Sequence, residues 1–239
     1  MPLFLIACVV SFLPYLFLFL WLRGLRKNDA AYRELCGKAL GRGALCIFPV
    51  VLLSGVSYVL LRLTGIHKTA PLLYQAVYDF VVLAFMEEFA KFRMFRRTVR
   101  QADSPVSWLD AAALMTIVGI GFGAAESVEY AIGASIPVVL VRGICMPHAG
   151  YGFITGYFWG KGVRTGRPAV RRLGFVISWL VHGLYDLSLS EAFLAISEDL
   201  VFVPLLLALL EIVFVIRLIF FARKARNRDE YTEPLPIGS

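Results

Sequence analysis

Apolar residues fall into seven long segments separated by shorter polar connections. An α-helix needs about 20 predominantly apolar residues to cross the hydrocarbon core of a bilayer, and the segments are close to that length. The pattern therefore predicts an all-α, polytopic transmembrane helix bundle. The expected spans cover residues 3–22, 43–63, 71–92, 109–132, 136–159, 172–190 and 200–222.

The first apolar segment could also be a secretory signal peptide. However, it lacks a basic n-region, its apolar run is long, and Arg23, Arg26 and Lys27 follow it directly. We therefore expect residues 3–22 to be a retained first helix.

The composition excludes a soluble domain. Of the 239 residues, 59% are hydrophobic and only 17% are charged, whereas soluble chains carry about a quarter charged residues. The spans leave no room for a separate soluble domain, so we expect residues 1–228 to form one membrane domain. Residues 229–239 are polar and contain proline, and we expect a disordered tail. The four cysteines have no paired spacing, which suggests neither a disulfide framework nor a zinc finger.

The net charge of +7 is distributed unevenly among the connections. Basic residues cluster after the first, third, fifth and seventh spans, while the intervening connections carry few basic residues or are acidic. The positive-inside rule then predicts an N-terminus outside and a C-terminus in the cytoplasm. The basic excess is explained by topology and by contact with lipid headgroups in the bilayer, so no nucleic-acid partner is expected.

Glycines and one proline mark two neighbouring spans. Small residues at regular spacing allow membrane helices to approach closely; here they are Gly119, Gly121 and Gly123 in the fourth span and Gly152, Gly156 and Gly160 in the fifth. Pro147 removes a backbone hydrogen bond and is expected to bend the fifth span beside His148.

Two adjacent carboxylates and a lysine interrupt the apolar third span. Charge at bilayer depth costs several kcal/mol, so ionisable residues there usually mark a site or an internal ion pair. On a helix, Lys91 lies one turn from both Glu87 and Glu88 and can pair with at least one of them. One carboxylate is then left over, and it is the candidate base.

Further ionisable residues lie inside the later spans. His182 and Asp186 share one helix face because they are four residues apart, and the others include Asp79, Glu126, Glu129, Arg142, His148 and Glu211. Two imidazoles and several carboxylates could bind zinc, with a position left for water. Without metal, a glutamate and a histidine could polarise water as general bases. Both versions predict hydrolysis of a bond that reaches into the bilayer.

Each feature also has a structural interpretation. The Glu87, Glu88 and Lys91 group could be an ion-pair network between helices, and His148 could be a hydrogen-bonded packing residue. We assign Asp79 and Glu211 to structural pairing, with Arg142 as one possible partner. A proton-coupled transporter also uses buried carboxylates and histidines, but no repeated half with interrupted helices is found. The double glutamate and both embedded histidines fall in spans three to six, which favours a catalytic site.

The order of these motifs resembles the PrsW family. The matching pattern is Glu87-Glu88-x-x-Lys91, Phe122-x-x-x-Glu126, an isolated His148, and His182-x-x-x-Asp186, over roughly residues 70–190. That family is a branch of a superfamily of intramembrane proteases that includes type II CAAX prenyl endopeptidases and the Aph-1 subunit of γ-secretase. Asp186 stands where CAAX enzymes often have asparagine, which favours the PrsW branch.

The resemblance implies a membrane endopeptidase of the bacterial plasma membrane. PrsW-like proteins are associated with the first, extracytoplasmic cut of a membrane-spanning anti-sigma factor, so the expected partner is a single-pass membrane protein substrate. By this resemblance Glu87 or Glu88 activates water, and His148 and His182 hold zinc or share base and oxyanion roles. Glu126 and Asp186 complete the set of residues around the zinc or orient the two histidines. The alternatives are a CAAX-type prenyl endopeptidase and a non-catalytic, Aph-1-like scaffold.

Overall fold

The computed structural model describes the backbone of residues 2–133 and 135–236. Side chains are described from Val9 onwards, except at positions 129–134, 137, 138, 142, 198 and 237–239. Every regular element in the described residues is helical, apart from one isolated bridge between Ser107 and Pro234. The prediction of an all-α bundle is therefore confirmed.

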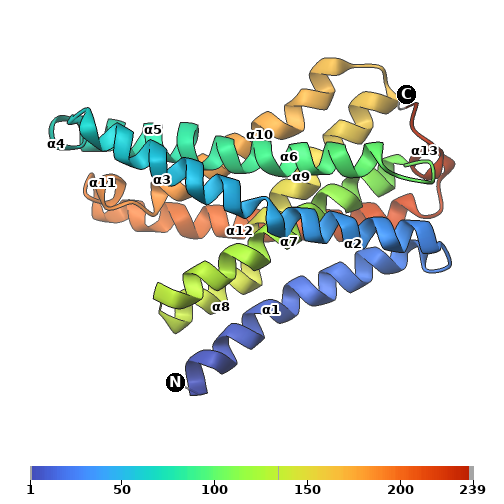
Figure 1. Ribbon diagram of the computed structural model, residues 1–239, viewed down its shortest axis with the longest axis horizontal. Helices are drawn as coiled ribbons and strands as arrows, with labels where there is room; N and C mark the ends of the chain where they lie inside the picture. The colour runs from blue at the N-terminus through green and yellow to red at the C-terminus, as the bar shows by residue number, and fades with distance from the viewer. Residues whose placement is uncertain (1, 134, 237–239) are drawn as a thin grey trace.

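Helices cover each of the predicted spans, and they also occupy some of the predicted connections; Figure 1 shows their arrangement. Two 3₁₀ turns, Gly24–Arg26 and Glu198–Val201, and one π-helix, η2 (Tyr78–Ala84), accompany the α-helices. The α-helices are α1 (Pro2–Arg23), α2 (Ala30–Leu45), α3 (Ile47–Leu63), α4 (Ile66–Thr69), α5 (Pro71–Val77), α6 (Phe85–Arg100), α7 (Trp108–Gly133), α8 (Ile136–Cys145), α9 (Pro147–Arg164), α10 (Pro168–Ser188), α11 (Glu191–Leu194), α12 (Phe202–Ala225) and α13 (Asp229–Thr232).

Within the described residues, four helical stretches are long and apolar enough to cross a membrane by length and composition alone. They are Val9–Arg26, Ala30–Leu63, Trp108–Val128 and Asp199–Ala225. The other three predicted spans correspond to α5–η2–α6, α8–α9 and α10, which carry the double glutamate, the histidines and several arginines. Polar side chains lower the hydropathy of these helices, and the buried ones face the interior of the bundle. The protein is an integral membrane protein.

The prediction that residues 30–42 form a basic connection before the second span is wrong, because these residues belong to helix α2. The Asp29 carboxylate accepts the Tyr32 backbone N–H at 2.9 Å, a cap that begins the helix. Tyr32 and Cys36 are then buried on one face, while basic residues lie on the other. Helix α2 continues into α3 with only Cys46 between them, so together they form one long rod.

Helix α7 occupies the centre of the bundle between α2, α6 and α9. Most of its length is buried. Gly152 and Gly156 of α9 lie against the backbone of α7 at Met115 and Ala111, where a Cβ atom would come within 2.6 Å of a carbonyl oxygen. The expected role of these small residues in close helix approach is therefore confirmed, and it brings α9 directly beside α7.

The bend expected at Pro147 is a complete break. Met146 adopts a left-handed backbone conformation, with φ of 46°, and separates α8 from α9. Pro147 then occupies the first turn of α9, where its missing N–H costs nothing. Helix α8 leaves the core and lies beside the N-terminal half of α1 (Figure 1). His148 is thereby placed at the buried start of a new helix.

The tail expected to be disordered is ordered in residues 229–236. The Tyr231 ring lies 4.8 Å from the Trp108 ring, and the Leu235 N–H donates to the Val106 carbonyl at 2.9 Å. These contacts hold the tail on the end of the bundle where α1 and α6 also end. The short helices α4 and α11 lie at the opposite end (Figure 1).

Candidate active site

A π-helix directly before α6 fixes the register of the candidate site. In η2 the Phe85 N–H bonds to the Phe80 carbonyl, five residues earlier, and this carbonyl also accepts the indole N–H of Trp179 at 2.6 Å. Single π-turns inside helices occur frequently at functional sites. Here the turn ties α10 to the residues immediately before the double glutamate.

Glu88 is fully buried and holds two cationic or polar partners with a single oxygen. Its Oε1 accepts from Lys91 Nζ at 2.6 Å and from His182 Nδ1 at 3.0 Å. Glu88 therefore connects α6 to α10. A buried carboxylate with a charged partner is far less costly than an isolated one.

Lys91 extends the network to α9 and α7. Its Nζ atom lies 2.8 Å from His148 Nδ1 and 4.4 Å from the centre of the Phe122 ring. An ammonium group can only donate, so His148 Nδ1 accepts. The ring proton of His148 is consequently on Nε2, which donates to Glu126 Oε2 at 2.6 Å. Both ring nitrogens of His148 are thus engaged.

Acceptor atoms converge on the second ring nitrogen of His182. With Nδ1 donating to Glu88, Nε2 faces Asp186 Oδ2 at 3.3 Å and Glu87 Oε2 at 3.7 Å. Ionised carboxylates are acceptors only. A positive charge between these atoms, either a proton on Nε2 or a metal ion, satisfies all three groups.

Glu87 differs from Glu88 in its surroundings. Its Oε2 atom is buried without a hydrogen-bond partner and lies 3.8 Å from Lys91 Nζ, which Glu88 already holds. Glu88 Oε2 is also without a partner, but only Glu87 lines the adjoining cavity. Glu87 is therefore the carboxylate left over after Lys91 is paired.

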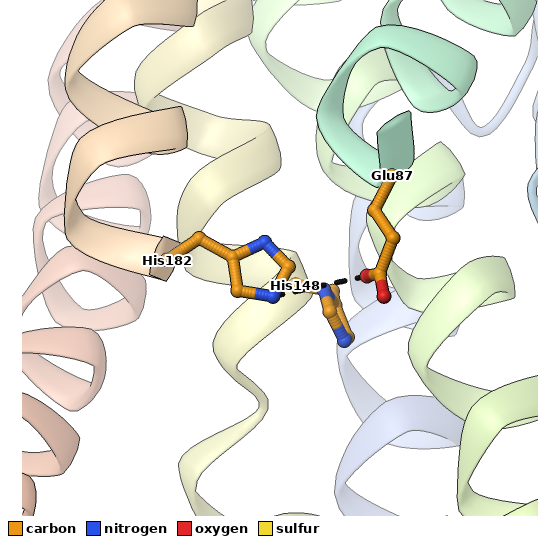
Figure 2. A group of neighbouring side chains, drawn as sticks. All are labelled: Glu87, His148 and His182. Carbon is orange, nitrogen blue, oxygen red and sulfur yellow. Dashed lines mark ion pairs between the residues drawn. The ribbon is translucent and has the colours of Figure 1, made fainter. Parts of the chain in front are cut away.

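The donor atoms of the site fit a divalent metal ion. Glu87, His148 and His182 each offer one ligand atom, and these atoms lie within 4.8 Å of one another. They come from α6, α9 and α10 and point toward a common centre (Figure 2). Two histidines and one glutamate also form the ligand set of several catalytic zinc sites. His148 would exchange one of its present partners for the ion.

A cavity of about 650 Å³ adjoins the cluster. Its walls come from α3, α5, η2, α6, α7 and the end of α10, and its apolar lining includes Ile47, Val50 and Phe122. Four carboxylates line it, from Asp79, Glu87, Glu126 and Asp186. Glu87 therefore borders both the buried cluster and this cavity.

The structure brings together all seven residues predicted for the site. The group spaced for a metal contains Glu87, whereas the predicted ligands Glu126 and Asp186 contact the ring nitrogens of the histidines. Asp79 accepts from the Gln75 side chain at 2.8 Å, as the structural assignment expected. The side chains of Glu129 and Arg142 lie outside the described residues.

Tyr151 is a site residue that the sequence reasoning missed. Its ring stacks on the His182 ring at 4.9 Å between centroids, and its hydroxyl donates to the Glu211 carboxylate. Glu211 is thus paired structurally, with a tyrosine of α9. The available signal was the three-residue spacing from His148, which places Tyr151 on the same helix face.

The fold and the cluster define a polytopic membrane protein with a buried glutamate–histidine site beside a cavity. A family model described as PrsW family intramembrane metalloprotease matches residues 33–216. The match covers more than half of the chain, which therefore belongs to this family. The relation to CAAX endopeptidases and Aph-1 stays a prediction.

One curated relative is similar over part of its length. Protease PrsW of Oceanobacillus iheyensis is 28% identical over 116 residues, which cover 46% of this chain and 54% of that protein. The chain thus spans about half the length of this curated relative. No solved structure showed significant similarity to the chain.

Proposed function

We propose that this protein is a membrane-embedded endopeptidase that cuts a single-pass membrane protein. The observation that carries the proposal is the buried Oε2 atom of Glu87 at the cavity wall, which has no hydrogen-bond partner and lies 3.7 Å from His182 Nε2. A carboxylate in that position can accept a proton from water. Family membership and the similarity to Protease PrsW support this reaction class.

In the proposed mechanism Glu87 is the general base. A water molecule beside Glu87 loses a proton to Oε2 while its oxygen attacks the peptide carbonyl carbon. The carbon–nitrogen bond then breaks, and the proton passes from Glu87 to the leaving amine. Glu88 acts indirectly, because it orients His182 and holds Lys91. General acid–base catalysis of this kind contributes about 10²–10⁴-fold to a rate.

Zinc is the proposed metal, with His148 and His182 as ligands and Glu126 and Asp186 completing the set. A zinc ion would supply Lewis-acid polarisation of the peptide carbonyl. Both carboxylates already lie beside the imidazoles, at 2.6 Å and 3.3 Å. Glu87 belongs to the group that is spaced for a metal, and the proposal is that Glu126 and Asp186 take the remaining positions on the ion, so that Glu87 acts as the base rather than as a ligand.

We expect the N-terminus outside and the C-terminus in the cytoplasm. The basic α1–α2 connection and the C-terminal end of α6 lie at the end of the bundle that holds the C-terminus (Figure 1). The positive-inside rule places that end in the cytoplasm. A C-terminal epitope tag should then resist protease added to intact spheroplasts and be digested after lysis. Digestion in intact spheroplasts would reverse the proposed orientation.

The proposed substrate is an anti-sigma-factor-like protein that spans the membrane once. Wild type and His182→Ala should be compared in bacterial membranes by sequencing of newly formed peptide ends. We expect wild type to generate new ends at the extracytoplasmic border of single-pass proteins, and His182→Ala to generate none. Purified wild type should carry about one zinc per chain, as expected for a four-ligand site, and a His148→Ala/His182→Ala variant should carry none.

A non-catalytic scaffold is the second candidate. The network of Glu88, Lys91, His148 and His182 joins α6, α9 and α10 and is almost fully buried, as expected of a structural core. In that case His182→Ala would reduce the amount of folded protein, and no substrate ends would depend on wild type.

A further inference from the structure

A second cavity lies on the outer side of α6, away from the candidate site. It is a groove of about 310 Å³ between α6 and α10. Four phenylalanines form its apolar walls, and three arginines line it as well. The lining residues are Phe85, Phe89, Phe92, Phe175, Arg96, Arg171 and Arg172.

The apolar and basic residues are separated along the bundle axis. On α6, Arg96 follows Phe92 by one turn, and on the antiparallel α10, Arg171 precedes Phe175 by one turn. The arginines from both helices therefore lie at the same end of the groove. This end is the one with the basic connections. The groove is basic at one end and apolar along the rest. This polarity matches that of a phospholipid, which has a charged headgroup and apolar acyl chains.

The charge of the three arginines is not neutralised within the described residues. None of them forms an ion pair with a carboxylate there, and the Arg96 guanidinium lies 6.0 Å from the centre of the Phe92 ring. Phe85 and Phe89 are 38% and 47% exposed, so the groove is open on the outer surface of the bundle. The positive-inside rule accounts for basic residues at this end, but not for a shared groove lined by two helices.

We propose that this groove binds one anionic phospholipid, with its phosphate on Arg96, Arg171 and Arg172 and its acyl chain against the phenylalanines. Arginine pairs well with phosphate because its planar group offers several donors in a fixed geometry. Basic pockets between transmembrane helices on the cytoplasmic side recognise anionic headgroups in this way. Phosphatidylglycerol has the required chemistry.

Lipid in the groove would brace the helices that build the candidate site. Phe85 contacts Phe175 and Trp179 of α10, at 6.0 Å and 5.6 Å between ring centroids. On the inner side of the same helix pair, Glu88 accepts from His182. A lipid spanning both helices therefore stabilises the geometry of Glu88 and His182. This consequence for activity rests on the proposed function, whereas lipid binding does not.

The test is native mass spectrometry of the purified chain with phosphatidylglycerol or phosphatidylcholine. The groove variant is Arg96→Gln/Arg171→Gln/Arg172→Gln. The matched control, Arg93→Gln/Arg97→Gln/Arg100→Gln, removes the same charge from exposed positions of α6 that do not line the groove. We expect wild type and control to retain one phosphatidylglycerol, and the groove variant to bind it about 100-fold more weakly, given the contribution of each arginine near anionic lipid.

A lysine version, Arg96→Lys/Arg171→Lys/Arg172→Lys, separates loss of charge from misfolding, and it should recover part of the binding. Equal retention of phosphatidylcholine, equal weakening in the control, or equal binding of soluble glycerol phosphate would each overturn the proposal. If lipid binds as expected but no substrate is cut, the proposed function fails and the lipid site stands.

Discussion

Replacing Glu87 with glutamine is expected to abolish peptide-bond cleavage while the bundle remains folded. Glutamine has nearly the same shape, but it cannot accept the proton of the attacking water. The expected loss of activity is about 10³-fold, within the usual contribution of a general base. Stability should change little, because Glu87 Oε2 has no hydrogen-bond partner and its contacts with Lys91 and His182 are long, at 3.8 Å and 3.7 Å.

Glu88→Gln is the matched comparison, since it makes the same chemical change one residue away. It weakens the bonds to Lys91 and His182, so we expect both stability and activity to fall. Three quantities should be measured for each variant: the cleavage rate, the thermal midpoint in detergent and the zinc content. Glu87→Gln should keep its zinc. Loss of zinc in that variant would make Glu87 a metal ligand, and near-normal cleavage would exclude it as the base.

The pattern of apolar and charged residues was sufficient to predict the helical class and which ionisable residues lie close together in the bundle. Long apolar runs specify helices in a bilayer because all backbone groups must be satisfied within the chain. Ionisable residues in those runs are costly, so their presence indicated contacts between spans. Glu87, Glu88, Lys91, His148 and His182 indeed lie together. Helical spacing alone could not separate the two glutamates, because both lie within one turn of Lys91.

Features that depend on packing between helices could not be predicted from one sequence. The π-helix at Tyr78–Ala84 is supported by Trp179, almost 100 residues later, through the Phe80 carbonyl. The break at Met146 depends on α8 packing against α1, while α9 packs against α7. Helix α2 was not predicted because the basic residues on its polar face are also typical of a loop, and its buried face carries few strongly apolar residues. The local pattern of apolar and polar residues does not encode which distant helix a segment packs against.

The split of roles within the site also follows from packing. Glu88 is held by Lys91, which contacts His148 of α9, and by His182 of α10, and it does not line the cavity. Glu87, one position earlier, turns about 100° around the helix and reaches the cavity wall. The two adjacent glutamates thus have different surroundings, which supports the proposed roles of Glu88 as a support and of Glu87 as the base.

Replacing Lys91 with methionine is expected to destabilise the protein strongly. Lys91 is fully buried, and its removal leaves the Glu88 charge without a cation at 2.6 Å and His148 Nδ1 without a donor. Breaking a buried ion pair from one side costs about 3–5 kcal/mol. The measurement is the free energy of unfolding in mixed micelles titrated with SDS.

The double variant Glu88→Gln/Lys91→Met decides whether this cost arises from the uncompensated charge. Glutamine is neutral and its amide oxygen still accepts from His182 Nδ1, so the double variant should be more stable than Lys91→Met alone. We expect recovery of at least about half of the lost free energy, because replacing both members of a buried pair is often close to neutral. If the two single effects simply add, Lys91 stabilises the bundle by packing, and its contribution does not depend on the charge of Glu88.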